Sequence, residues 1–117
     1  MQISPLIISL VMLANAERAE PLTLAPDLTI MAQVRADYLC GRKLSHDGFK
    51  DFVSALPYSN VGENLAKDTG DATSTHQRFM KSPLHKANIV DKRYTHMGVG
   101  SACGVTVELF GKAVAKK

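Results

Sequence analysis

The sequence predicts a single α+β domain in which helices pack against a small antiparallel sheet. Three observations support this fold class. The first two-thirds of the chain carries apolar residues at helical spacing, whereas residues 105–109 alternate between apolar and polar as in a strand. Gly104 separates that strand from Met97 and Val99, as in a hairpin. A chain of 117 residues also has the size of one domain, residues 1–117, and buries about two-thirds of its unfolded surface.

The composition is that of an ordinary globular protein. Hydrophobic residues make up 45% and charged residues 21% of the chain, which excludes wholesale disorder and a coiled coil. The net charge is +3, and the basic residues are scattered over 78–93 with a short tail at Lys112, Lys116 and Lys117. Because nucleic-acid-binding proteins cluster Lys and Arg on one face, we expect no nucleic-acid partner.

Residues 1–16 have two interpretations. Residues 6–14 are apolar except for Ser9, and residues 14–16 have the small-x-small form of a cleavage site, so the segment resembles a secretory signal. However, no Lys or Arg precedes Arg18, and a signal normally begins with positive charge. The alternative is a first helix of the fold, buried on nearly all sides. The apolar run is too short to cross a bilayer comfortably, so we expect no transmembrane span.

A second helix is expected after residues 21–26, whose two prolines exclude helical conformation at the residues before them. Asp27 is the predicted N-cap, and Gly41 is the natural stop. Residues 43–57 indicate a loop with one helical turn. The apolar positions of the helix are Leu28, Met31, Ala32, Leu39 and, more loosely, Tyr38.

The second half of the chain is predicted to alternate short elements. Residues 60–66 form a strand or a loop that enters the core, and residues 68–71 are turn-like. An amphipathic helix follows over 72–80, ends at Ser82-Pro83, and is followed by a short helix over 84–90. The strands of the hairpin complete the chain.

Cys40 and Cys103 lie far apart and form no C-x-x-C unit, which argues against a redox motif or a zinc ribbon. In an oxidising compartment they could pair and add about 4 kcal/mol of stability in the chain-entropy model. In a reducing compartment they would be two small buried hydrophobic residues. The sequence leaves both alternatives open.

His46, Glu63 and His85 are the candidate functional residues, although they are too far apart for a local metal motif. Taken singly, each has an ordinary explanation as a loop, capping or helix-end residue. His76 and His96 are assigned to structure. Ser–His pairs exist at Ser45-His46 and Ser82/His85, but no G-x-S-x-G elbow accompanies them.

The order of the motifs resembles the CAP superfamily, also called the SCP family of cysteine-rich secretory, antigen and pathogenesis-related proteins, and especially its small bacterial members. The resemblance covers nearly the whole chain, and the Gly-Glu-Asn and Ser-Pro-x-His motifs are the most specific. The matching stretches are 15–19 with 21–22, Asp27-Leu28, Ser45-His46, Gly62-Glu63-Asn64-Leu65-Ala66, 82–89, 95–100 and Leu109-Phe110-Gly111.

This resemblance implies an α-β-α sandwich with a central antiparallel sheet and a cleft. It assigns the cleft to His46, Glu63 and His85, with Asn64 and Ser82 of the same motifs as further ligand-binding residues. In some family members the histidines bind a divalent cation, so the resemblance implies that His46 and His85 could hold Zn²⁺.

Two departures from the family pattern affect that site. Larger members carry a second glutamate where this chain has Ser82, so the four-residue set is reduced to three. Phe79 stands where a Trp is common. The family's first helix ends in an Asn-x-Glu-Arg-like segment, which favours retention of residues 1–16 in the fold.

The leading hypothesis is a monomeric, secreted or envelope-facing domain that binds a small molecule, a lipid, a peptide or a cell-wall component around His46, Glu63 and His85. It requires no catalysis. The alternative is a metal-dependent, peptidase-like hydrolase in which Glu63 acts as general base on a water bound to the metal. A third possibility is a structural domain with a vestigial cleft.

Overall fold

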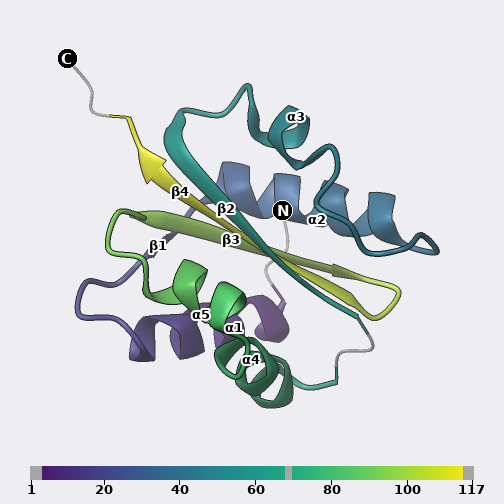
Figure 1. The fold of residues 1–117 in the computed structure, drawn as a ribbon, viewed down its shortest axis with the longest axis horizontal. Coiled ribbons are helices and arrows are strands. Elements are labelled where there is room, and N and C mark those ends of the chain that lie inside the picture. The colour runs from purple at the N-terminus through teal and green to yellow at the C-terminus, as the bar shows by residue number, and fades with distance from the viewer. Residues whose placement is uncertain (1–3, 68–69, 115–117) are drawn as a thin grey trace.

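The fold is a three-layer α-β-α sandwich. The computed structural model describes residues 4–67 and 70–114. A four-stranded sheet lies between α2 and α3 on one face and α1, α4 and α5 on the other (Figure 1). The elements are α1 (Pro5–Ala16), β1 (Thr23–Leu24), α2 (Pro26–Leu39), α3 (Phe49–Val53), β2 (Tyr58–Ala66), α4 (Ala72–Met80), α5 (Pro83–Val90), β3 (His96–Ala102) and β4 (Val105–Ala113).

The sheet has the strand order β1-β3-β4-β2. β4 pairs antiparallel with both β3 and β2, which makes β2 an edge strand. The predicted α+β class and sandwich architecture are confirmed. The sheet is mixed rather than wholly antiparallel, because Thr23 and Leu24 of the proline-bracketed connector add a short strand parallel to β3.

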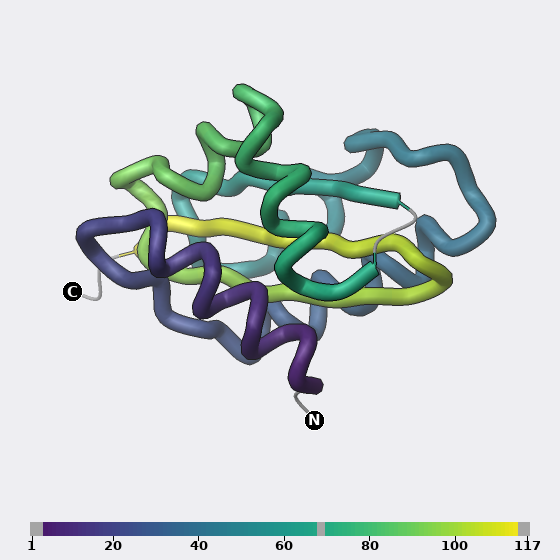
Figure 2. Tube along the Cα trace, turned by 90° about the horizontal axis from the view of Figure 1, so that it is seen from below, coloured from purple at the N-terminus to yellow at the C-terminus, as the bar shows by residue number. Residues whose placement is uncertain are grey.

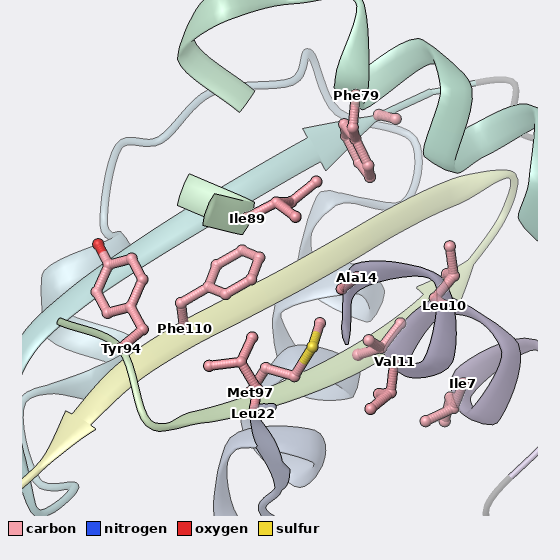
Figure 3. Close-up of a cluster of buried hydrophobic side chains, with 12 residues drawn as sticks. Ile7, Leu10, Val11, Ala14, Leu22, Phe79, Ile89, Tyr94, Met97 and Phe110 are labelled. Carbon is pink, nitrogen blue, oxygen red and sulfur yellow. The ribbon is translucent and has the colours of Figure 1, made fainter. Parts of the chain in front are cut away.

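One hydrophobic core lies between the sheet and the layer of α1, α4 and α5, which lie on the viewer's side of the sheet in Figure 2. Strand residues on this face, such as Met97 and Phe110, belong to the same buried cluster as Phe79 of α4 and Ile89 of α5. Figure 3 shows these side chains converging over the sheet. A second core lies under α2 and α3 on the opposite face, so both faces of the sheet are covered.

The first helix begins at Pro5, and the Ser4 side chain caps it by accepting a hydrogen bond from the Ile7 N–H. Only one face is buried, through residues such as Leu10 and Ala14. The expectation that this helix is buried on nearly all sides is wrong: Met12 is 67% exposed, because α4 and β3 cover a single side of the helix.

Two expectations about the chain stay predictions. One is whether residues 1–16 are cleaved in the cell, and the other is that residues 1–117 form a single domain.

The second helix differs from prediction at its start. Its N-cap is Ala25, and Pro26 occupies the first turn, so Asp27 is not the cap. Asp27 Oδ1 instead accepts hydrogen bonds from the Leu28 N–H at 2.7 Å and the Tyr58 hydroxyl at 2.8 Å. Tyr38, a predicted core position, is 45% exposed because the helix turns it toward solvent.

Two glycines bring α2 directly onto β3. A Cβ atom at Gly98 would overlap backbone atoms of Leu28 and Thr29, and one at Gly100 would overlap the backbone of Ala32 and Gln33. Real Cβ atoms do not approach so closely, so helix and strand pack at backbone distance only because both positions are glycine. This contact fixes the height of α2 above the sheet.

The Cys40 and Cys103 sulfurs form a disulfide, which resolves the alternative that the sequence left open. Cys40 is the C-cap of α2, and Cys103 lies in the turn between β3 and β4. The bond therefore ties the end of α2 to the far end of the hairpin, with a Cα–Cα distance of 5.5 Å.

The remaining predicted elements are found, with small shifts of boundary. The helical turn expected in 43–57 is α3, and the strand alternative for 60–66 is correct. Of the predicted turn 68–71, residues 68 and 69 lie outside the described residues. Within the described part of the chain, no helix combines the length and apolar character needed to cross a membrane.

Replacing Gly98 with Ala should lower the free energy of unfolding by about 3 kcal/mol, because the new methyl group meets helix backbone that cannot move away. Gly70→Ala is the matched control, since nothing lies within 4 Å of its added Cβ, and should change stability by at most about 0.5 kcal/mol. Urea denaturation measures both. Equal stability of the two variants would contradict the close packing of α2 on β3.

The double substitution Cys40→Ala and Cys103→Ala should lower the free energy of unfolding by about 4 kcal/mol, because the bond closes a sequence separation of 63 residues. Guanidinium denaturation of oxidised wild type and of the double variant gives this difference. Two free thiols in wild-type protein prepared under oxidising conditions, counted by mass spectrometry after alkylation, would contradict the pairing.

Candidate functional site

A buried ion pair lies between α2 and the edge strand β2. Arg35 Nε donates to Glu63 Oε2 at 2.7 Å, and Arg35 Nη2 donates to Glu63 Oε1 at 3.2 Å. The two side chains are 0% and 1% exposed. Such a paired geometry matches the planar guanidinium to the carboxylate and satisfies charges that would otherwise be costly to bury.

Arg35 also holds the loop that carries His46. Its Nη2 donates to the Ser45 carbonyl at 2.8 Å, and its Nη1 donates to the Asp47 carbonyl at 3.0 Å. The guanidinium lies over the ring of Phe52 at 5.0 Å from the ring centre. One side chain of α2 therefore fixes the loop on both sides of His46.

Glu63 orients the imidazole of His46. His46 Nδ1 lies 2.8 Å from Glu63 Oε1. Because an ionised carboxylate only accepts hydrogen bonds, Nδ1 must carry the proton. In neutral His46, Nε2 is then the unprotonated nitrogen, on a side chain that is 61% exposed. His46 is thus anchored on one side and open to solvent on the other.

Asn64, the next residue of β2, faces the opposite layer. Its amide nitrogen donates to the His85 carbonyl at 3.1 Å and to Glu108 Oε1 at 3.2 Å. The Asn88 amide nitrogen donates to Asn64 Oδ1 at 2.9 Å and to the Glu63 carbonyl at 3.2 Å. These amide contacts tie α5 to the edge strand.

His85 lies in the first half of α5, with its ring centre 5.1 Å from that of Phe79. Burial lowers the pKa of His85, and the neighbouring charges of His46 and Arg78 lower it further. His85 is therefore a neutral imidazole near pH 7, able both to donate and to accept a hydrogen bond.

A cavity of about 250 Å³ lies where the loop before α3, the end of β2, and the α4–α5 junction meet. Its lining combines apolar and polar side chains. The Arg78 guanidinium is positioned there by a hydrogen bond from Nη1 to the Lys67 carbonyl at 2.8 Å. The lining residues are Leu44, Leu65, Ala66, Phe79, Lys67, Arg78, Ser82 and His85.

The structure brings the predicted site residues to one edge of the sheet, but they do not all contact one another. Glu63 contacts His46, whereas His85 is linked to the pair by the electrostatic effect of His46 and by the Asn64 amide, which donates to the His85 carbonyl. Ser82 is the N-cap residue of α5 and lines the cavity, and its side chain makes no capping hydrogen bond. Their role in ligand binding stays a prediction.

Sequence reasoning missed Arg35 and Glu108. Arg35 occupies a core-facing position of α2, in register with Ala32 and Leu39, and a cation at such a position is the signal that could have revealed it. Glu108 occupies a polar position in the alternation of β4, and it is buried because helices cover both faces of the sheet. Elsewhere, His76 is buried, and its Nε2 lies 3.4 Å from Glu17 Oε2.

The donor set fits a zinc ion poorly. Among the described residues, no group of three or more His, Cys, Asp or Glu side chains could hold a metal. Both oxygens of Glu63 are engaged by Arg35, which leaves two imidazoles where zinc sites use at least three protein ligands. Zinc binding by His46 and His85 stays a prediction.

Comparison with known proteins identifies the family. A family model described as CAP, the cysteine-rich secretory protein family, matches residues 15–107, which is most of the chain. The chain belongs to the CAP family. The predicted resemblance is therefore confirmed. No curated protein matches the sequence significantly.

Solved structures support the CAP fold. An extracellular protein containing an SCP domain from Bacillus anthracis str. Ames superposes with a TM-score of 0.86 at 19% identity, over 96% of this chain and 45% of the other. A cysteine-rich secretory protein from Staphylococcus aureus gives 0.78 at 18% identity, covering 91% of this chain and 38% of the other. An outer surface protein from Borrelia burgdorferi gives 0.77 at 19% identity, covering 92% and 91%.

These identities are low, so the structural likeness establishes the fold alone. The chain spans less than half the length of the Bacillus and Staphylococcus proteins but nearly all of the Borrelia protein.

Replacing Arg35 with Met should lower the free energy of unfolding by about 3–5 kcal/mol, because Glu63 is left as an unpaired buried charge. The double variant Arg35→Met with Glu63→Leu should recover most of this loss, since both charges are gone. Urea denaturation of the four members of this cycle measures the coupling. Additive effects of the two substitutions would contradict the ion pair.

Proposed function

We propose that this CAP domain binds a small anionic ligand with an apolar portion in the cavity between the loop before α3 and the α4–α5 junction. The composition of the cavity lining is the main support for this proposal. Four side chains are apolar, and the polar ones are Lys67, Arg78, Ser82 and His85, with no carboxylate among the described lining residues. A carboxylate or phosphate group is the chemistry that two cations and two hydrogen-bonding groups recognise.

The apolar lining residues of the cavity support the second part of the proposal, the apolar portion of the ligand. Leu44, Leu65, Ala66 and Phe79 present hydrocarbon surface, and a short alkyl or aromatic group gains about 25 cal/mol for each Å² that it removes from water. The volume of about 250 Å³ suits a small molecule or one end of a longer lipid or peptide. The ligand class is thus an anionic amphiphile.

The geometry of Glu63 favours binding over hydrolysis. A general base must reach the water that it activates. Glu63 is 1% exposed and accepts hydrogen bonds from Arg35 and His46, so it acts as an orienting group. His46 is held by Glu63 as a largely solvent-exposed imidazole.

An extracytoplasmic location is part of the proposal. The Bacillus protein is described as extracellular and the Borrelia protein as an outer surface protein. The Cys40–Cys103 disulfide supports the same location, because such bonds persist mainly in oxidising compartments.

The proposal is tested by titrating the ¹⁵N-labelled protein with octanoate, octyl phosphate and, as the uncharged control, octanol. We expect the two anions to shift the amides of Lys67, Ser82 and His85 and to bind more tightly than octanol. Arg78→Gln should weaken anion binding about tenfold, the effect of losing about 1.4 kcal/mol from a charged hydrogen bond.

Lys92→Gln is the matched control, because Lys92 is exposed and lies at another surface depression, near Glu20 and Val90. It should leave anion affinity unchanged. Equal affinities for octanol and octanoate, or equal losses in the Arg78 and Lys92 variants, would contradict the anionic part of the proposal. Absence of shifts at the cavity amides would contradict the site itself.

A further inference from the structure

Glu108 is a carboxyl group in the interior of the protein. It lies in the middle of β4, on the same face as Phe110 and therefore beneath the layer of α1, α4 and α5. Its exposure is 0%. The site proposed above makes no direct use of it, so its presence at this position needs a physical account.

The contacts of Glu108 are few. Oε1 accepts a hydrogen bond from the Asn64 amide at 3.2 Å, while Oε2 is buried and has no partner in the part of the chain that the structure describes. Buried polar atoms are normally paired, and a carboxylate with one hydrogen bond is far from satisfied.

Among residues 4–67 and 70–114, no cation forms an ion pair with this carboxyl group. Its register partners on β2 and β3 are Asn64 and Val99, and α1 carries no titratable residue. The titratable residues of α4 are His76, which pairs with Glu17, and the exposed Arg78; those of α5 are His85 and the exposed Lys86. The Arg35–Glu63 pair is on the opposite face of the sheet.

Asn64 links Glu108 to the proposed ligand cavity. The same amide nitrogen that donates to Glu108 also donates to the carbonyl of His85, a cavity-lining residue. Because α5 is held to the edge strand through Asn64 and Asn88, the state of Glu108 bears on how firmly α5 sits against the sheet.

We propose that Glu108 is a proton-controlled positioning residue for the α5 wall of the ligand cavity. This inference rests on the proposed function for its biological meaning, but its physical part is independent of any ligand. In the neutral acid, Asn64 bridges Glu108 and His85 and α5 is closed on the sheet. When the O–H bond breaks and the proton passes to solvent, the carboxylate needs water, and α5 is the element that must lift to admit it.

The direction of the pH dependence follows from the burial of Glu108. Burial raises its pKa from 4.5 to about 7, and the Asn64 hydrogen bond opposes this only in part. The folded state therefore holds the proton more tightly than an opened state. The resulting stabilisation is complete below about pH 4.5 and is lost as pH rises through about 7.

Hydrogen exchange of the ligand-free protein tests the switch directly. With carboxyl pKa values of about 7 closed and 4.5 open, protection factors of the α5 amides should fall roughly thirtyfold between pH 5.5 and 8.5. In Glu108→Gln, which keeps the shape and cannot ionise, they should stay constant. Glu20→Gln, which removes an exposed carboxylate, should behave as wild type.

The amides of α2 serve as an internal control in the wild-type protein, so the test survives if Glu108→Gln fails to fold. A thirtyfold fall confined to α5 and neighbouring α4 supports the proposal. A fall of equal size in α2, which would indicate global opening, or α5 protection that does not change with pH, would overturn it.

A second experiment tests whether ionisation of Glu108 affects ligand binding. Octanoate affinity, measured from pH 6 to 8.5, should fall more steeply in wild type than in Glu108→Gln, and the difference between them should follow the exchange data. Equal slopes together with a pH-dependent α5 would overturn the coupling to the cavity while leaving the local switch. If octanoate binds neither protein, the proposed ligand class fails, and the exchange experiment still decides the role of Glu108.

Discussion

The interaction on which the site depends is the buried pair between Arg35 and Glu63. Burying two charges is costly, and a pair of apolar residues can be as stable at such a position. The pair is therefore better understood through what it positions. Arg35 extends from α2 to two carbonyls of the loop before α3, and Glu63 extends from β2 to His46. Helix, loop and edge strand are held in one arrangement by one guanidinium and one carboxylate.

The edge strand β2 connects this arrangement to the helices on the other face of the sheet. Successive residues of a strand face opposite sides, so Glu63 joins the layer of α2 while Asn64 joins the layer of α5. The cavity forms around this edge, with Leu44 supplied by one layer and Phe79 by the other. A site at the edge of the sandwich explains why its residues are scattered through the sequence. It also explains why a buried group on β4 can influence the cavity wall, since Asn64 contacts both.

Much of the architecture follows from local sequence signals, but the site does not. Proline and glycine boundaries and apolar spacing define the helices from α2 onward, and the alternation after Gly104 defines β4. Asp27 was wrongly expected to cap α2 because local preference could not show that Pro26 already starts the helix. The helical register of Arg35 could have marked it as buried, but its partners, and those of Glu108, are distant in sequence and could not be inferred. The nearness of His46 to Glu63 was suggested by family resemblance and depends physically on Arg35.

The Arg35–Glu63 pair fixes His46 through its Nδ1–H and leaves Nε2 toward solvent. The most direct test is the tautomer of His46, read from the ¹⁵N chemical shifts of its ring in labelled protein at pH 8. The structure predicts that Nδ1 carries the proton in wild type and that this preference is lost in Glu63→Leu with Arg35→Met. A wild-type His46 protonated mainly at Nε2, or one unaffected by removal of the pair, would contradict the account.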